Sequence, residues 1–384
     1  MQRRLSACLL LLLWVWVPVV FAGNLPEKLG LHGGRNIYEA ACAACHGHQG
    51  EGTPTDVAGF DQPDTFPHFN KCDETTPEYT RDWKAVILQG GAARGFSHIM
   101  PSFGGVLTSK QADEVVAYLR SLCPDKTWPL GELNVPRALL TEKAFPESET
   151  VLTSAINAQG RAGITNELVY ERILGKHDQL EIAIPFEWAR QEGGGSAGGL
   201  GDIAAGVKHV LFSSVHPPRD GPFSDSTGSI LSVQGEILLP TGSTAHGFGS
   251  GYPGLGLFAA YDQVFPAQTF MQVQAGVDLP LRTTHVARSA FVRTAFGKTF
   301  VEGGEIGPRL WTPMVEVVAN RDLTRGAVTD FDVVPEFQVT LNRRQHVRAA
   351  LGYLVPVNNT AGRPRQVEFY VLWDWFDGGL LEGW

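Results

Sequence analysis

Three residues near the N-terminus have the types and the spacing needed to bind an iron porphyrin. Cys42 and Cys45 stand three positions apart, and His46 follows directly in the segment CAACH. On one helical turn, two such thiols can each bond covalently to a vinyl group of haem, while the adjacent imidazole becomes an axial iron ligand. The pattern therefore predicts one covalently bound haem c per chain, attached through Cys42 and Cys45 and ligated by His46.

The same two cysteines also fit half of a zinc site or a redox-active dithiol. A zinc site needs a second pair of ligands, but the other cysteines stand singly, at Cys8, Cys72 and Cys123. A thioredoxin-like dithiol lies at a strand-to-helix turn and has no use for a histidine directly after its second cysteine. Haem attachment is therefore the favoured interpretation.

The composition limits the classes of protein and of partner. A chain of 384 residues is long enough for more than one core. Its 44 glycines and its charged fraction of 18% favour turns and strands over long charged helices. The net charge of -9 and the lack of a basic stretch argue against nucleic acid as a partner.

Residues 1–22 have the pattern of a secretory signal peptide. Two arginines precede an apolar run from Leu9 to Val20, and cleavage is expected after about Ala22. The run is too short to span a bilayer, and Cys8 is removed with it. The mature chain then enters an oxidising compartment, where disulfides persist. Cys72 and Cys123 are left as a pair, and a disulfide between them is expected.

Residues 23–128 have the pattern of a small helical domain. One helix is expected to begin at residue 35 or 36 and to lead into the CAACH segment. Glycines and prolines over residues 47–67 predict an irregular loop, and a cap followed by proline predicts a helix over residues 76–90. The last helix is expected over residues 108–122, where Thr108 and Gln111 form a capping box.

A second iron ligand is expected in the loop before the last helix. Of the four methionines, Met100 lies in this domain, and the others lie in the signal peptide or in the later, strand-rich region. The alternatives are a packing role for Met100 and three rival ligands, His48, His68 and His98. Thioether ligation raises the reduction potential and leaves no free position on the iron. The haem would then carry electrons, and an enzyme is tenable only if the iron lacks its methionine.

These features together resemble a class I monohaem cytochrome c. They are a helix with glycine and then an aromatic residue four positions on, the CXXCH segment, Met100 before a proline, and a closing helix with Ala117-Tyr118. The resemblance implies an all-α domain over residues 23–128. It also implies that His46 is the proximal ligand and Met100 the distal ligand, with no catalytic residue.

Residues 129–148 contain three prolines and hold no periodicity, so they are expected to be a linker. Beyond them, residues 149–384 contain segments in which apolar and polar residues alternate. The clearest are Gln179–Arg190, Ser229–Pro240, Thr269–Leu281, Thr329–Asn342 and Gln366–Trp375, with weaker runs near residues 149, 163, 203, 254, 289, 310 and 347. About twelve strands are therefore predicted.

A soluble sandwich and a transmembrane barrel both generate this pattern. Strands of about ten residues match a tilted crossing of a bilayer. Short connections at residues 266–268 and 343–344 alternate with long, glycine-rich ones, although the long connection at residues 216–227 breaks this rule. An antiparallel transmembrane β-barrel of about 12 strands is the prediction, and the sandwich is the alternative.

The barrel region carries two further signals. Its last strand is aromatic and the chain ends at Trp384, which resembles the assembly signal of outer-membrane proteins. Residues 145–384 taken whole resemble the porin-like barrels associated with phenol-degradation pathways. The expected inward face is acidic and contains Glu181, Glu187, Glu236, Asp278, Glu316, Glu336, Glu368 and Asp374. Such a lumen would attract cations, and a solvated interior without selectivity is the alternative.

A cytochrome c followed by a barrel resembles the cytochrome-porin fusions proposed to carry electrons across the outer membrane, including outer-membrane iron oxidases. The resemblance implies an outer-membrane location with the cytochrome in the periplasm. It implies outer-membrane lipid and a periplasmic electron carrier as partners, with a donor or acceptor reached through the barrel. This chain departs from the iron oxidases in its full-sized cytochrome with its own Met100 and in its smaller barrel, so their substrate does not carry over. A solute channel with the cytochrome as redox sensor or anchor is the alternative.

A barrel of this size is too narrow to enclose a whole domain. The cytochrome is therefore expected beneath the barrel.

Overall fold

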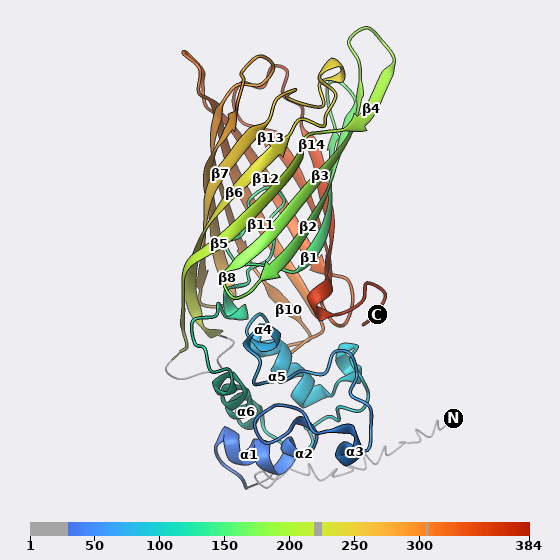
Figure 1. The fold of residues 1–384 in the computed structure, drawn as a ribbon, viewed down its shortest axis with the longest axis vertical. Coiled ribbons are helices and arrows are strands. Elements are labelled where there is room, and N and C mark those ends of the chain that lie inside the picture. Colours follow the sequence, from blue (N-terminus) through green and yellow to red (C-terminus); the bar gives the residue numbers. More distant parts are fainter. Residues whose placement is uncertain (1–29, 219–224, 305) are drawn as a thin grey trace, which may run out of the picture.

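The structure is a computed structural model that describes residues 30–218, 225–304 and 306–384. The predicted signal peptide, residues 1–22, lies outside the described residues. A helical domain lies at one end of a long β-barrel, and the C-terminus lies at the same end (Figure 1). The helical domain is beneath the barrel and not inside it, as the sequence predicts.

The helical domain contains α1 (Gly34–Ala41), α2 (Ala43–His46), α3 (Thr55–Ala58), α4 (Cys72–Thr75), α5 (Thr80–Gln89), the 3-10 turn η1 (Ala92–Arg94) and α6 (Ser109–Leu122). The predicted capping box is present, because the Thr108 hydroxyl accepts from the Gln111 N–H at 3.2 Å and the Gln111 side chain accepts from the Thr108 N–H at 2.9 Å. The second predicted helix begins at Thr80 rather than at residue 76. The Thr80 N–H donates to the Glu132 carboxylate at 2.9 Å, a contact from outside the helix that its own sequence does not signal.

The core of this domain lies where α1 crosses α6. Gly34 allows the two helices to approach closely, because a Cβ at this position would overlap the backbone carbonyl of Glu114. The ring of Tyr38, fully buried, lies 5.2 Å from that of Tyr118. The glycine and the aromatic residue four positions later therefore fix this crossing. Among the described residues, no helix is long and apolar enough to cross a membrane.

The barrel is one antiparallel sheet. Its strands are β1 (Glu149–Asn157), β2 (Gly163–Leu174), β3 (Asp178–Arg190), β4 (Ser196–Leu200), β5 (Ile203–His216), β6 (Thr227–Leu239), β7 (Gly254–Phe265), β8 (Thr269–Pro280), β9 (Ser289–Lys298), β10 (Phe300–Glu302), β11 (Arg309–Asp322), β12 (Asp330–Thr340), β13 (Val347–Pro356) and β14 (Gln366–Asp374). The ring closes where β14 pairs with β1 and β9 pairs with β11. Twelve strands form the closed barrel, and β4 and β10 are short additions at its two ends.

The prediction of about twelve strands is confirmed, since each of the five clear runs and seven weaker runs corresponds to a strand of the ring. The two short additions, β4 and β10, were not predicted. β4 has the sequence SAGGL and β10 has three residues, so neither is long enough to show an alternation.

The barrel exposes its apolar residues and buries its polar ones. Phe186 and Trp188 are 42% and 41% exposed on the outside of β3, whereas Gln179 and Glu181 on the same strand are 0% and 7% exposed. The same arrangement, with apolar residues outside and polar residues inside, extends around the ring and is the reverse of that in a soluble protein. A sandwich with a soluble surface is therefore excluded, because its apolar face would be the buried one.

The segment predicted to be a linker continues into the barrel. Residues 134–148, called the lumenal segment from here on, include Lys143, Ala144 and Phe145, which are at most 1% exposed. The wall accepts hydrogen bonds from its backbone, including those of Leu139 to Glu336 and of Thr141 to Glu316, at 3.0 and 2.7 Å. The segment connects the two domains, but it also fills part of the lumen.

Other wall residues hold the same backbone. The N–H groups of Ala144 and Glu147 donate to Asp262 and Gln179, both at 2.7 Å. These acceptors belong to β7 and β3, which are three strands apart in the ring. Five of the acidic residues predicted to face inward are buried there, namely Glu181, Glu316, Glu336, Glu368 and Asp374, and three are half-buried, namely Glu187, Glu236 and Asp278. Part of the acidic lining is therefore occupied in holding the segment.

Candidate haem site

The CAACH segment lies at the junction of α1 and α2. Cys42 ends one helix and begins the next, with its N–H bonded to the Tyr38 carbonyl at 2.8 Å and its own carbonyl accepting from the His46 N–H at 3.0 Å. The Tyr38 hydroxyl donates to the Gly47 carbonyl at 2.7 Å, which fixes the end of the turn. One helical turn thus carries Cys42, Cys45 and His46, as the spacing predicts.

Met100 lies in the loop after α5. The loop is closed tightly, because the Gly91 N–H donates to the Met100 carbonyl at 3.0 Å and a Cβ on Gly91 would overlap the Ser97 carbonyl. This closure holds the methionine at the edge of the same cavity that Cys42, Cys45 and His46 line. The structure therefore brings together all four predicted haem residues.

The cavity that these four residues share has a volume of about 680 Å³, within the usual range for sites that bind small molecules. Its walls in the helical domain are mostly apolar and include Phe66, Phe69, Trp83, Val86, Ile87, Ile99, Phe103 and Leu119. A flat, largely apolar macrocycle matches a cavity of this size and character.

The chemistry of the cysteine and histidine side chains fits haem as well. Both cysteines are free, and burial together with the Cys45 thiol raises the pKa of Cys42 to about 11. A raised pKa argues against a reactive dithiol, which needs a lowered one. Burial lowers the pKa of His46 to about 4, so its imidazole is neutral, as an iron ligand must be. Its Nδ1 is buried without a partner among the described residues.

Two of the three rival histidines are placed less favourably than Met100. His68 is the remaining rival, because it lines the cavity and its Nδ1 is bonded to Glu74 at 2.8 Å, a contact of the kind that orients the Nε2 of metal-bound histidines. His48 points into solvent with its side chain 80% exposed, and its Nδ1 is paired with Glu39. His98 is exposed and does not line the cavity. Met100 therefore stays the proposed second ligand.

Cys72 and Cys123 form a disulfide in the structure, with an S–S distance of 1.99 Å. It joins α4 to the residue that follows α6. Both sulfur-bearing residues are buried. The closing helix is thereby tied to the body of the domain beside the cavity.

The cavity reaches beyond the helical domain. Barrel residues that line it include Arg344, Arg348, Trp375, Phe376 and Asp377. The sequence patterns assign these residues no role at a haem site: residues 343–344 were predicted to be a short turn, and Trp375 was predicted to end the last strand. No pattern in the sequence signals that this turn and the end of β14 lie against the haem cavity.

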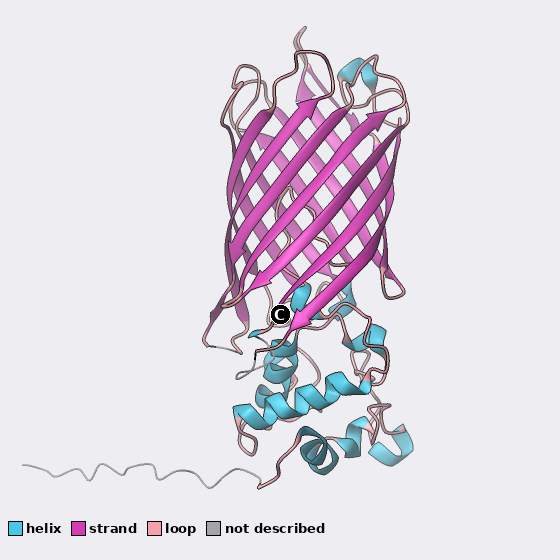
Figure 2. Ribbon diagram, turned by 90° about the vertical axis from the view of Figure 1, so that its left-hand side faces the viewer, coloured by secondary structure: helices cyan, strands magenta, loops and turns pink. Residues whose placement is uncertain are grey.

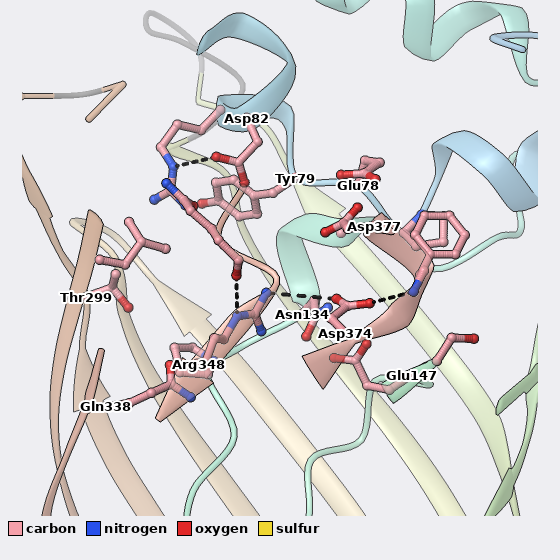
Figure 3. Close-up of a pocket in the computed structure, with 18 of the residues that line it drawn as sticks. Glu78, Tyr79, Asp82, Asn134, Glu147, Thr299, Gln338, Arg348, Asp374 and Asp377 are labelled. Carbon is pink, nitrogen blue, oxygen red and sulfur yellow. Dashed lines mark hydrogen bonds and ion pairs between the residues drawn. The ribbon is translucent and has the colours of Figure 1, made fainter. Parts of the chain in front are cut away.

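A smaller cavity of about 110 Å³ lies next to the first at the junction of the two domains. Figure 3 shows Glu78 and Asp377 facing each other there, near Asp374 and Arg348. Burial raises the pKa of Glu78 to about 6, and Asp374 and Asp82 act in the same direction, while hydrogen bonding to Asp377 and the charge of Arg120 act against it. An acidic group with a pKa of about 6 thus lines the haem cavity as well as the junction.

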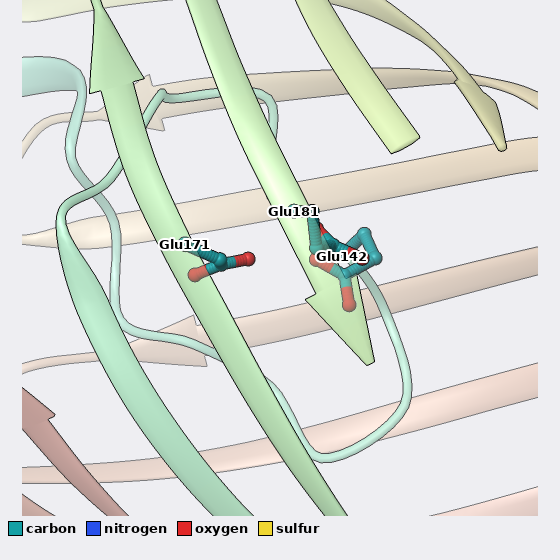
Figure 4. A group of neighbouring side chains, drawn as sticks. All are labelled: Glu142, Glu171 and Glu181. Atoms are coloured by element: carbon teal, nitrogen blue, oxygen red, sulfur yellow. The ribbon is translucent and has the colours of Figure 1, made fainter. Parts of the chain in front are cut away.

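A cluster of carboxylates inside the barrel is a second candidate site. The ligand atoms of Glu142, Glu171 and Glu181 lie within 4.8 Å of one another (Figure 4). However, the guanidinium of Arg137 contacts Glu142 and Glu171 at 3.0 Å, and also Glu149. The arginine supplies positive charge to this cluster, so its geometry is that of an ion-pair network within the lumenal segment and wall.

The fold and the site define the class of this protein: a cytochrome c domain followed by a closed β-barrel. Residues 30–119 match the family model described as "Cytochrome C oxidase, cbb3-type, subunit III". No curated protein sequence matches the chain.

Several solved structures are similar to part of the chain. They include the KdgM porin in complex with disordered oligogalacturonate, at 8% identity and a TM-score of 0.33, covering 59% of this chain and 98% of that one. The β domain of the Bordetella autotransporter BrkA is 12% identical, with a TM-score of 0.29 and coverages of 59% and 96%. Salmonella typhi OmpF in complex with daunomycin is 8% identical, with a TM-score of 0.26 and coverages of 59% and 95%. At such scores these likenesses carry no argument about what this chain binds.

Proposed function

We propose that this protein transfers electrons through a covalently bound haem at the bacterial outer membrane. The observation that carries the proposal is that Cys42, Cys45, His46 and Met100 line one apolar cavity of a cytochrome c domain. A bound haem supplies the one-electron couple of its iron. The two cysteines would anchor the group, His46 and Met100 would supply the nitrogen and sulfur ligands of its iron, and the mostly apolar walls would limit the access of water. No position is left for a substrate, which favours electron transfer over bond chemistry.

The outer surface of the barrel supports the membrane location. Apolar residues that point outward are exposed on strands far apart in the ring, for example Val317, Leu257 and Leu351 at 46%, 46% and 59%. Such an outward-facing apolar band is what a transmembrane barrel presents to lipid. Outer-membrane lipid is therefore the proposed surrounding of the ring.

The connections support an orientation with the cytochrome in the periplasm. The short β2–β3 and β7–β8 turns lie against the helical domain, where Lys176 pairs with Asp125 at 3.1 Å and Gln268 bonds to Tyr79 at 3.2 Å. The long, glycine-rich loops lie at the opposite end (Figure 2). Bacterial barrels place short turns in the periplasm and long loops outside. A periplasmic carrier is thus the proposed partner on the cytochrome side.

The lumenal segment disfavours the alternative function, a solute channel. Glu316 and Glu336, which bind its backbone, lie midway along β11 and β12, so the segment reaches the middle of the barrel. A solute would have to displace a backbone held by several buried bonds. The donor or acceptor on the far side would then enter the outer half of the lumen, while only electrons continue toward the haem.

Proteoliposomes that contain the intact, haem-loaded protein test this proposal. The orientation is determined by protease digestion of the long loops, and a membrane-impermeant reductant is supplied on the loop side only. Reduction of the haem, read from its visible spectrum, together with an absence of solute-dependent vesicle swelling, is expected. Swelling at the rate of an open porin, with no haem reduction from the loop side, would establish the channel instead.

A further inference from the structure

We propose that the barrel completes the haem site, with Arg344 and Trp375 donating hydrogen bonds to the carboxylate groups of the haem. This inference rests on the proposed function, because it concerns the same haem. Haem is apolar over most of its ring but carries two carboxylates on one edge. A site that encloses it therefore needs donors or cations where that edge lies.

Arg344 is a buried cation with one unused donor. Its side chain is 6% exposed, and its Nη1 donates to the Asp377 carbonyl at 2.9 Å and to the Glu382 carboxylate at 2.6 Å. Its Nη2 donates to the Gly95 carbonyl, while its Nε is buried without a partner among the described residues. A buried N–H without an acceptor is costly, so an acceptor in the adjoining cavity would stabilise this arrangement.

The other arginines that line the cavity are already engaged. Arg94 donates to Asp82 at 2.8 Å and to the Gly307 carbonyl at 3.0 Å. Arg348 donates through Nε to the Gln345 carbonyl at 3.0 Å and faces Asp374 at 4.0 Å. Within the described part of the chain, Arg344 is thus the arginine of this cavity whose buried N–H lacks a partner.

Trp375 provides a second donor of the same kind. Its indole Nε1 is buried without a partner among the described residues, and the residue lines the same cavity. Both Arg344 and Trp375 belong to the barrel part of the chain, whereas Cys42 and His46 belong to the helical domain. The two residues with unused donors line a cavity whose walls in the helical domain are mostly apolar and include the acidic residues Glu78 and Asp82, so the barrel side, which supplies these donors, is where carboxylates would be held.

The two domains are in direct contact at this point. The guanidinium of Arg344 lies over the Phe96 ring at 4.6 Å, and the same group binds the C-terminal tail at Glu382. Arg344 lies in the turn between β12 and β13. It therefore links this turn to the cytochrome loop at Phe96 and to the C-terminal tail at Glu382. A haem held there would have its carboxylate edge directed at the end of the barrel that contacts the helical domain.

The test compares two neighbouring arginines in the full-length, haem-loaded protein. Arg344→Gln removes the buried cation, and Arg343→Gln removes an exposed one from the same turn. Loss of a cation near the iron favours the oxidised form. We expect the reduction equilibrium constant of Arg344→Gln to fall by about tenfold relative to Arg343→Gln, equivalent to 59 mV for one electron. The haem-propionate bending band in the resonance Raman spectrum should shift in the same variant, and Arg344→Lys should restore part of the potential.

Trp375→Phe removes a donor while keeping a ring against Tyr170. This variant tests the proposed hydrogen bonds to the haem carboxylates if Arg344→Gln fails to assemble. It should shift the propionate band with a smaller loss of potential. Unchanged potentials and bands in Trp375→Phe and in every assembled Arg344 variant, relative to Arg343→Gln, would overturn this inference and leave the proposed function intact. A wild-type protein without covalent haem would overturn the proposed function itself.

Discussion

Gly95 of the cytochrome loop lies directly against Gly383 of the C-terminal tail. A Cβ added to Gly95 would overlap the Cα of Gly383, and Gly95 also has a φ of +73°, which side chains rarely adopt. The Gly383 carbonyl in turn accepts from the Arg343 N–H at 2.8 Å. The tail is thus held between the barrel turn and the cytochrome, and it joins the two domains.

Gly95→Ala should weaken this junction. The left-handed backbone conformation alone costs about 1–3 kcal/mol for a residue other than glycine, and the overlap adds to it. We expect faster tryptic cleavage between the domains and a lower thermal midpoint, measured by the haem absorbance. Gly105→Ala is the control, because a Cβ there meets nothing within 4 Å. Equal behaviour of the two variants would show that this contact does not hold the domains together.

Arg137 should be required to hold the lumenal segment. Arg137→Ala leaves the buried carboxylates of Glu149 and Glu171 without their cation, and breaking a buried ion pair costs about 3–5 kcal/mol. A lower unfolding temperature and new ion conductance across planar bilayers are expected. Arg161→Ala removes an exposed partner of Glu192 and should change neither quantity. If the Arg137 variant stays as stable and as closed as Arg161→Ala, the segment is held by other contacts.

The reduction potential should fall as the pH rises through about 6. Glu78 lines the haem cavity with a pKa near that value. It is neutral at lower pH and negatively charged above, and a negative charge near the iron stabilises the oxidised form. Glu78→Gln should therefore flatten the pH dependence measured by spectroelectrochemistry.

Glu74→Gln is the control for this titration. Glu74 lines the same cavity, but its pKa is lowered because hydrogen bonds from Lys71 and His68 outweigh its partial burial. It stays ionised over the range studied, so its replacement should keep the slope near pH 6. A slope that persists in Glu78→Gln would assign the titration to another group.

Met100→Ala should open the iron to external ligands. Because Met100 lines the cavity with His46, its loss leaves the sixth position vacant, and the reduced protein should bind carbon monoxide. The wild-type protein should show a methionine-to-iron charge-transfer band, and the variant should lack it. Met314→Ala, which alters a buried methionine of the barrel, should retain the band. A wild-type protein without this band would refute the ligand assignment.

The Cys72–Cys123 bond should contribute to the stability of the helical domain. Its sequence separation is 51 residues, and the chain-entropy account gives about 4 kcal/mol for a loop of that size. A Cys72→Ser, Cys123→Ser double variant should unfold at lower denaturant concentration. Alkylation of the denatured, unreduced wild-type protein should modify neither cysteine, and two modified thiols would contradict the pairing.

Sequence patterns with a local physical origin predicted much of the molecule. The spacing in CAACH places three side chains on one helical turn, and the Thr108–Gln111 pair completes a cap within four residues. Alternation along a strand depends only on the pleat, so twelve strands and the identity of their polar face were predictable. Their closure into a ring needs the pairing of β1 with β14 and of β9 with β11, which no single strand specifies.

Only the tertiary structure decided what residues 129–148 and Arg344 do. The lumenal segment looks aperiodic because the wall binds largely its backbone N–H groups, which are the same in every residue except proline and leave no mark on the sequence. Arg344 donates a hydrogen bond to the Gly95 carbonyl, although 249 residues of sequence separate the two. This contact requires a closed barrel and a tail that lies against the cytochrome domain. Local spacing therefore determines the covalent attachment of the proposed haem and its histidine ligand. The proposed surroundings of the haem depend on contacts that exist only once both domains have folded and docked.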